Sequence, residues 1–139
     1  MRGEAVSQRL MAGNTNGSQS LQSLIEAVRG KLGKPIAILR LDGGYLSQET
    51  LNYAKQNRLH LCMAARYDWI LACGTSVDEQ KWQRLDSKTR LYELGVVSVI
   101  STSKHQFRTI LVEKEQEPFP GSKSKKKILR YGIMSRCYW

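Results

Sequence analysis

The chain has 139 residues, of which 41% are hydrophobic, and this is enough to bury the core of one modest domain. Its formal net charge of +10 and its pI of about 9.8 favour a polyanionic partner, and nucleic acid is the first to consider. No run approaches the roughly 20 apolar residues needed to cross a bilayer, and residues 1–10 lack the apolar core of a secretion signal. We therefore expect a cytoplasmic protein with no membrane contact.

The first half of the chain alternates between helical and strand patterns. Apolar residues three and four positions apart over residues 21–32 predict a helix, which a glycine and a proline end. The short apolar run 36–41, which lies between breaking residues, predicts a buried strand. Ser47 is a good N-cap for a second helix that ends near residues 57–58, and the apolar run 59–65 predicts a second strand. Strand, short helix and strand form a βαβ unit, so the two strands should be parallel.

The second half of the chain is β-prone. Residues 91–100 and 107–112 predict two strands, and the polar stretch 101–105 between them predicts a hairpin connection. Two prolines, a glycine, two serines and four lysines make residues 117–127 a predicted mobile loop. Residues 128–134 predict one last strand. The fold class is therefore α/β, with a β-rich second half.

Asp42 is the residue of the first half whose position suggests chemistry. It ends the apolar strand and is followed by two glycines, which let the chain turn sharply and leave space beside the carboxylate. In open α/β sheets ligands bind at the carboxyl ends of strands, and a carboxylate there suits Mg²⁺ or Mn²⁺. An ordinary Asp-Gly turn has the same sequence. On these residues alone, metal binding and a simple turn both stay open.

The segment around Asp42 resembles a motif of a known enzyme family. Residues 39–45, with the sequence LRLDGGY, resemble the second-aspartate motif of the DDE transposases of bacterial insertion sequences. The tripeptide Gly13-Asn14-Thr15 resembles the G-N-T loop that precedes this strand in the family, and a helix of the expected length lies between the two. A helix and an apolar strand that ends Ala64-Ala65-Arg66 continue the pattern. Residues 91–134 resemble the β insertion that many such enzymes place before their third acidic residue.

This resemblance implies a partial ribonuclease H-like fold. Residues 1–66 would form a partial core that contains the second-aspartate motif, and residues 67–139 a β-rich insertion with a basic loop at 117–127. In this family two Asp and one Glu hold two divalent ions, Mg²⁺ or Mn²⁺, which drive DNA strand cleavage and transfer in DNA transposition. By position Asp42 corresponds to the second acidic residue, so the resemblance makes it a catalytic residue and a metal ligand.

The family's other two acidic residues have no counterparts here. The only acidic residue before the G-N-T loop is Glu4, and no Asp or Glu follows Lys127. We assign Glu113, Glu115 and Glu117 to the solvated face of a hairpin rather than to the third position. The resemblance therefore implies a fragment that is inactive alone and needs the rest of the transposase from a neighbouring reading frame. It also implies an unpaired edge on the strand that ends at the second aspartate, because the family neighbour of that strand bears the first one.

A second candidate feature is a basic run near the end of the sequence. It consists of Lys123, Lys125, Lys126, Lys127 and Arg130. Clustered cations neutralise phosphates whatever the base sequence, so this run predicts non-specific binding of DNA. Nearby aromatic residues, such as Phe119, would allow base stacking. A solvated lysine-rich loop has the same sequence, and both interpretations stay open.

Arg66 and the cysteines each have an ordinary structural explanation. Arg66 ends the second predicted strand, where it could contact phosphate, but the favoured alternative is an ion pair at the surface. Cys62 is expected to be a small buried residue rather than a ligand, because no paired cysteine spacing occurs. For the whole chain, the rival hypotheses are a non-catalytic basic nucleic-acid-binding module and a decayed remnant without function.

Overall fold

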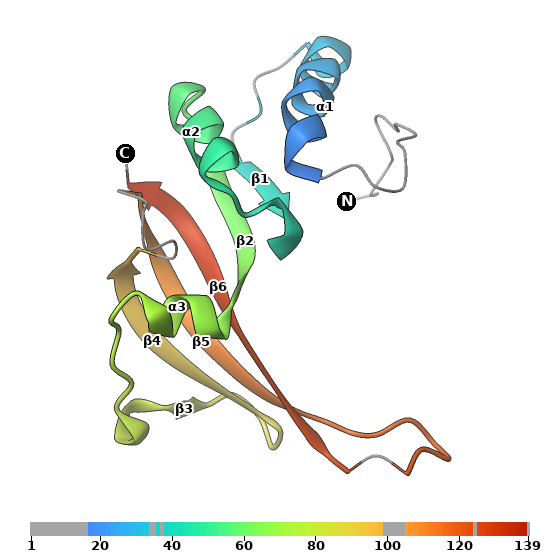
Figure 1. Ribbon diagram of the computed structural model, residues 1–139, viewed down its shortest axis with the longest axis vertical. Helices are drawn as coiled ribbons and strands as arrows, with labels where there is room; N and C mark the ends of the chain where they lie inside the picture. The colour runs from blue at the N-terminus through green and yellow to red at the C-terminus, as the bar shows by residue number, and fades with distance from the viewer. Residues whose placement is uncertain (1–16, 34–35, 37, 99–104, 124, 139) are drawn as a thin grey trace.

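The computed structural model describes residues 17–33, 36, 38–98, 105–123 and 125–138, with the backbone alone at 17–19 and 136–138. Three α-helices and a six-stranded mixed sheet make up this part of the chain, which confirms the α/β class (Figure 1). The helices are α1 (Gly17–Leu32), α2 (Gln48–Gln56) and α3 (Tyr67–Ala72), with short 3₁₀ turns η1 (Gly43–Tyr45) and η2 (Glu79–Lys81). The strands, in the spatial order β1-β2-β6-β5-β4-β3, are β1 (Ile38–Leu41), β2 (His60–Arg66), β3 (Gln83–Arg84), β4 (Thr89–Val97), β5 (Gln106–Gln116) and β6 (Lys127–Tyr138).

The two longer helices form where the sequence predicts them. α1 buries Leu21 and Ile25 and packs against η1 and α2. α2 begins after its N-cap Ser47, whose Oγ accepts a hydrogen bond of 3.1 Å from the backbone N–H three positions on. Its inner face is formed by the buried Leu51 and Ala54. None of the described helices is long and apolar enough to span a bilayer.

β1 and β2 pair in parallel, as the βαβ interpretation predicts, with Ile38 opposite His60 and Leu41 opposite Met63. The prediction that the first of these strands is buried is wrong, because Ile38 is 68% exposed and no residue of β1 is buried. The reason is that β1 ends the strand order, so within the described residues only β2 pairs with it. Among the described residues no strand pairs with the outer edge of β1, as the prediction of an unpaired edge on this strand states.

β4, β5 and β6 form an antiparallel meander that makes up the larger part of the sheet. The strands predicted at 91–100, 107–112 and 128–134 lie at 89–97, 106–116 and 127–138. The last two are longer than predicted because their pairing continues at both ends, from Gln106 opposite Tyr138 to Gln116 opposite Lys127. Most of the connection predicted at 101–105 lies outside the described residues.

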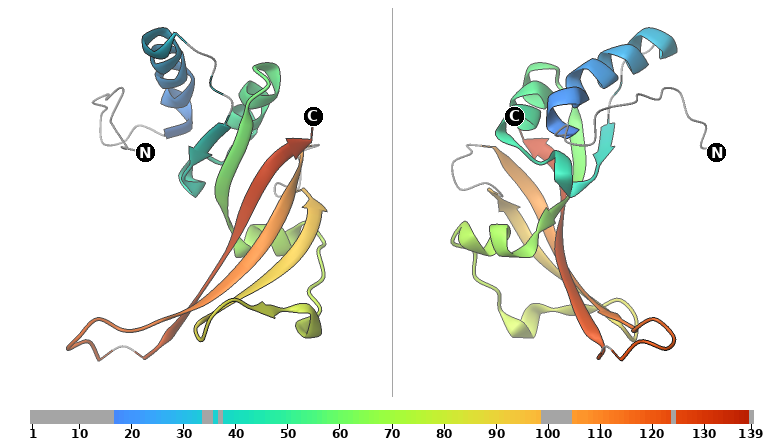
Figure 2. Two further views of the ribbon diagram at one scale, coloured as in Figure 1. Left: turned by 180° about the vertical axis from the view of Figure 1, so that it is seen from behind. Right: turned by 45° about the vertical axis from the view of Figure 1, so that its right-hand side comes forward.

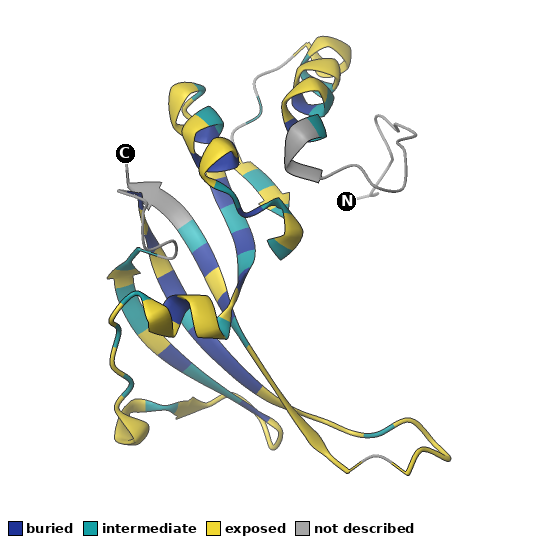
Figure 3. Ribbon diagram, viewed as in Figure 1, coloured by how far each residue is buried: buried dark blue, intermediate teal, exposed yellow. Residues whose placement is uncertain are grey.

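Successive residues of each strand point to opposite faces of the sheet, and α2 and α3 lie on one face (Figure 2). On this covered face the buried side chains include Leu61, Met63, Ala65, Phe107, Leu111 and Met134. Burial is concentrated where β2, β5 and β6 lie side by side (Figure 3). The opposite face is less covered, since Ile133 is 36% exposed and Cys62 and Ala64 are half-buried.

The sheet is continuous across the predicted domain boundary between residues 66 and 67. β2 pairs with β6 in antiparallel fashion, from Cys62 opposite Ser135 to Arg66 opposite Tyr131. The β-rich second half therefore extends the sheet that the first half begins. The division into two domains stays a prediction.

Gly132 of β6 makes room for α3. A Cβ atom at this position would lie 2.1 Å from Cδ1 of Ile70, which is the one buried residue of α3. Ile70 is fully buried, so its side chain has little space in which to move away. The absence of a side chain at Gly132 is therefore what lets the short helix lie against the sheet.

We expect Gly132→Ala to lower the free energy of unfolding by about 1–3 kcal/mol, because the added methyl group overpacks this contact. Gly30→Ala in α1 is the matched control, since nothing lies within 4 Å of its Cβ position. Alanine should stabilise that helix by about 0.5–1 kcal/mol relative to glycine. Urea unfolding of the parent and both variants measures the difference. Equal stability of the parent and Gly132→Ala would show that Ile70 repacks at no cost.

Candidate functional site

Asp42 lies at the carboxyl end of β1, where the sequence predicts it, and leads directly into η1. Its backbone carbonyl accepts a hydrogen bond of 3.0 Å from the N–H of Tyr45, so residues 42–45 form a tight turn. Its side chain is exposed and caps no backbone N–H of this turn. The turn therefore uses the backbone of Asp42 and leaves its carboxylate at the surface.

The first of the two glycines fixes the position of this turn. A Cβ atom on Gly43 would lie 3.0 Å from the carbonyl oxygen of Ala64 in β2, whereas the Cβ position of Gly44 has open space around it. Only a residue without a side chain lets η1 approach the backbone of β2 so closely. Gly43 thus holds the turn, and with it Asp42, against the neighbouring strand.

Asp42 borders a groove on the less covered face of the sheet. The groove is lined by residues of β1, β2 and β6 together with Asp42, namely Arg40, Leu41, Asp42, Cys62, Met63, Ala64, Tyr131 and Ile133. It therefore holds one carboxylate, one guanidinium, one thiol and one phenol. The prediction that Cys62 is buried is wrong, because its side chain points to this face and is only half-buried.

The groove does not complete a two-metal site. Asp42 is the one carboxylate that lines it, and the described residues contain no group of three His, Cys, Asp or Glu side chains that could hold a metal ion. Arg40 has only donors and cannot act as a ligand. The predicted G-N-T loop and Glu4 lie outside the described residues. Two divalent ions would need ligands beyond Asp42.

Arg66 forms an ion pair at the surface, as predicted. Its Nε and Nη2 donate to the two carboxylate oxygens of Asp68 at 3.1 Å and 2.7 Å, and both side chains are more than half exposed. The hydrogen bonds from Arg66 lower the pKa of the Asp68 carboxyl. The guanidinium also lies 5.3 Å from the ring centroid of Trp69. These local contacts explain the position of the Arg66 side chain, so a bound phosphate is not needed to explain it.

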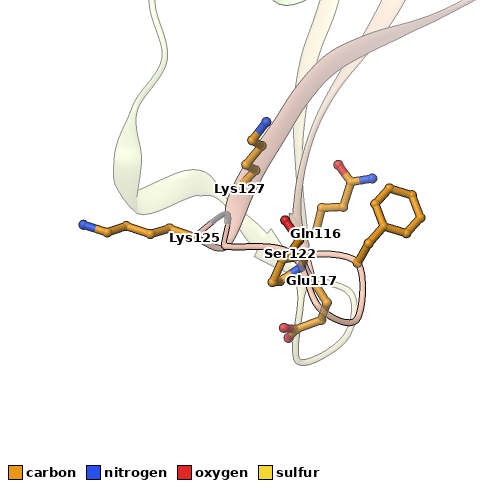
Figure 4. Close-up of a pocket in the computed structure, with 7 residues that line it drawn as sticks. Gln116, Glu117, Ser122, Lys125 and Lys127 are labelled. Atoms are coloured by element: carbon orange, nitrogen blue, oxygen red, sulfur yellow. The ribbon is translucent and has the colours of Figure 1, made fainter.

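The predicted basic run lies on a hairpin that projects from the body of the protein (Figures 1 and 2). We call residues 116–127 the arm: Gln116 and Lys127 pair across β5 and β6, and the described residues between them belong to no helix or strand. All four predicted lysines are exposed there, namely Lys123, Lys125, Lys126 and Lys127. The side chains of Lys125 and Lys127 point away from Glu117 (Figure 4).

Glu117 offsets only part of the positive charge of the arm. Its carboxylate lies 3.3 Å from Nζ of Lys88 and 3.6 Å from Nζ of Lys126, and the hydrogen bond from Lys88 lowers its pKa. Five lysines and two glutamates occur over residues 114–127, which leaves a net charge of +3. Within the described residues Lys123 and Lys125 have no carboxylate partner. The arm therefore presents cations that are available to phosphate groups.

The remaining member of the predicted basic run, Arg130, is half exposed and forms an ion pair with the buried Glu113. Arg130 Nε donates to one carboxylate oxygen of Glu113 at 2.9 Å, and Arg90 Nε donates to the other at 2.6 Å. Glu113 is 7% exposed, so its assignment to a solvated face is wrong. The cause is the register of β4, β5 and β6, which places Arg90, Glu113 and Arg130 side by side. Arg90 also pairs with Glu79 of η2.

Two aromatic rings lie beside the arginines of this ion-pair cluster. The Arg90 guanidinium lies 4.4 Å from the ring centroid of Trp82, and that of Arg130 lies 6.0 Å from the ring centroid of Tyr67. Burial alone would raise the pKa of Glu113, but the hydrogen bonds and charges of Arg90 and Arg130 outweigh it and hold this pKa below its usual value. The cluster is thus a structural network at the base of the arm rather than a reactive carboxylate.

Comparison with known proteins yields no relative from which a function could be transferred. Neither a scan against protein-family models nor a search of curated proteins gives a match to this chain. The groove beside Asp42 and the arm, which share strand β6, are the two features of the described residues that bear on function.

We expect Glu113→Gln to lower the free energy of unfolding by about 1–3 kcal/mol at pH 7, because two partly exposed arginines lose their common counter-charge. Glu93→Gln is the matched control. The Glu93–Arg108 ion pair joins β4 and β5, and both of its side chains are about half exposed. Its loss should therefore lower the free energy of unfolding by only about 0–1 kcal/mol.

The same pair of variants tests the pH dependence. The pKa of Glu113 is lower in the folded chain than in the unfolded chain, where it is about 4.3. Its stabilising contribution is therefore present above that value and is lost as the pH falls through the folded-state pKa. Urea unfolding between pH 7 and pH 3 should show the parent and Glu113→Gln converging at the acidic end. A constant difference at every pH would contradict this electrostatic account.

Proposed function

We propose that this chain is part of the catalytic domain of a bacterial DNA transposase with a ribonuclease H-like fold, to which it contributes the second-aspartate strand. The observation that carries the proposal is the exposed carboxylate of Asp42 at the carboxyl end of β1, beside the groove. The order of elements supports it: a helix, a strand followed by Asp-Gly-Gly-Tyr, a second helix and a parallel strand succeed one another as in the resemblance.

In this proposal Asp42 supplies one carboxylate, and the other ligands for Mg²⁺ or Mn²⁺ come from the rest of the transposase. The tight turn at η1 and the close approach of Gly43 to β2 position that carboxylate. The exposed edge of β1 is where a further strand of the domain would pair. A cytoplasmic protein that associates with the nucleoid through DNA fits this role.

We expect the isolated chain neither to cut nor to join DNA in Mg²⁺ or Mn²⁺, because Asp42 is the one carboxylate that the described residues bring to the groove. Plasmid nicking by the pure parent and by Asp42→Asn measures this activity. Metal-dependent nicking by the parent that is lost in Asp42→Asn would show that the chain completes its own site.

The genomic neighbourhood tests the family itself. Terminal inverted repeats, with coding sequence for the missing Asp and Glu, should flank the gene.

The arm supports a second candidate function, that of a basic module that binds nucleic acid without catalysis. Its exposed lysines project beyond the body of the protein, where a polyanion can reach them (Figure 1). This function requires no carboxylate and is compatible with a decayed transposase. It is favoured if the flanking genomic sequence supplies neither the repeats nor the missing acidic residues.

Both candidates predict weak, non-specific DNA binding through the arm. Replacing Lys123, Lys125, Lys126 and Lys127 by Gln together should lower the affinity and reduce the slope of log K against log salt by up to about 3–4, since each phosphate contact contributes roughly 0.9. A control variant that removes four exposed basic residues elsewhere replaces Lys31, Lys55, Arg58 and Lys81. Fluorescence anisotropy with a labelled duplex at several salt concentrations compares them. Equal losses in both variants would mean that net charge, rather than the arm, binds DNA.

A further inference from the structure

Phe119 is the most exposed large apolar side chain among the described residues, and it lies in the arm. It is 84% exposed, compared with 68% for Ile38 and 66% for Leu85, the next two. A ring so exposed contributes little to the stability of the fold, because burial of its apolar area is what would stabilise it. Its position on a charged, projecting loop therefore needs another explanation.

Phe119 is the first residue of a defined backbone turn in the arm. The N–H of Ser122 donates to the carbonyl oxygen of Phe119 at 2.9 Å, and Gly121 between them has a φ of +82°. Proline at the second position and a positive-φ glycine at the third are the signature of a type II turn. Pro118 and Pro120 flank Phe119, and each fixes its own φ. The turn and the two prolines therefore restrict the backbone on both sides of Phe119.

The charges beside Phe119 indicate what it contacts. Lys123 and Lys125 follow the turn directly and are exposed, and Lys127 begins β6 on the same arm. Lysines that neutralise phosphates next to an aromatic face form a combination that binds single-stranded nucleic acid, since unpaired bases can stack on the ring. In a duplex the base faces are already stacked on each other. An anionic membrane also binds cationic and aromatic side chains, but one Phe between two prolines offers little apolar area for insertion.

We propose that Phe119 stacks on an unpaired base of single-stranded DNA while the lysines of the arm hold the neighbouring phosphates. This inference rests on the DNA binding proposed above and adds to it a preference for unpaired strands. Phe119 is the binding residue that carries this preference, because the lysines bind phosphates of any strand.

The test compares Phe119→Ala, Phe119→Leu and Phe119→Tyr with the parent and with the quadruple lysine variant. Phe119→Leu keeps an apolar side chain but removes the aromatic face, and Phe119→Tyr keeps that face. Leu32→Ala removes another exposed apolar side chain, at the end of α1, and serves as the control. Fluorescence anisotropy measures the affinity of each protein for a labelled 20-nucleotide single strand and for the matching duplex, over a range of salt.

We expect Phe119→Ala and Phe119→Leu to bind the single strand roughly 5- to 150-fold more weakly than the parent, which is the range for loss of one stacked base. Their salt slope and their affinity for the duplex should not change, and Phe119→Tyr and Leu32→Ala should behave as the parent. The quadruple lysine variant should lose affinity for both DNAs and show a shallower slope.

Four results would overturn the inference. If Phe119→Ala binds the single strand as tightly as the parent while the quadruple lysine variant binds it more weakly, the arm binds DNA but Phe119 does not stack on a base. Phe119→Leu with parental affinity would show an apolar contact instead. Phe119-dependent binding to vesicles with 30 mol% anionic lipid, tighter than to the single strand, would assign the arm to a membrane. If the parent binds neither DNA, the proposed DNA binding fails as well.

Discussion

The antiparallel pairing of β2 with β6 joins two parts of the chain that are far apart in the sequence, and every other element depends on it. β1 reaches the rest of the sheet only through β2, and β5, β4 and β3 reach it only through β6. Met63 lies opposite Met134 and Ala65 opposite Gly132 across this pair, below the helices of the covered face. Strands β2 and β6, which both line the groove beside Asp42, are therefore held together by one ladder of hydrogen bonds.

Local signals predict the first half of the chain well. Helical spacing marks α1, the hydroxyl of Ser47 marks the start of α2, and a strand, helix and strand in close succession predict the parallel pair β1 and β2. Each of these signals acts over a few residues, so the sequence contains it directly. The turn that follows Asp42 at the end of β1 also follows from such a signal, because the glycines after it let the chain turn sharply.

Features that depend on the pairing of distant strands could not be predicted in the same way. Glu113 looks like part of a charged hairpin, and only the register with Arg90 and Arg130 shows that it is buried between two cations. The alternation over Thr109, Leu111 and Glu113 was the one available hint, since these positions share a face. Likewise, the apolar run of β1 indicates burial, but its exposure depends on which strands and helices lie beside it.

Strand β6 also sets the distance between the arm and the groove. It begins in the arm at Lys127 and reaches the wall of the groove at Tyr131 and Ile133, four and six residues later. At about 3.4 Å per residue, this separation is roughly 14–20 Å. B-form DNA repeats every 34–36 Å, so the spacing corresponds to about half a helical turn. In the proposed function, a duplex bound along β6 would therefore turn by half a helical turn between the arm and the groove, so the two places would meet different strands of the same DNA.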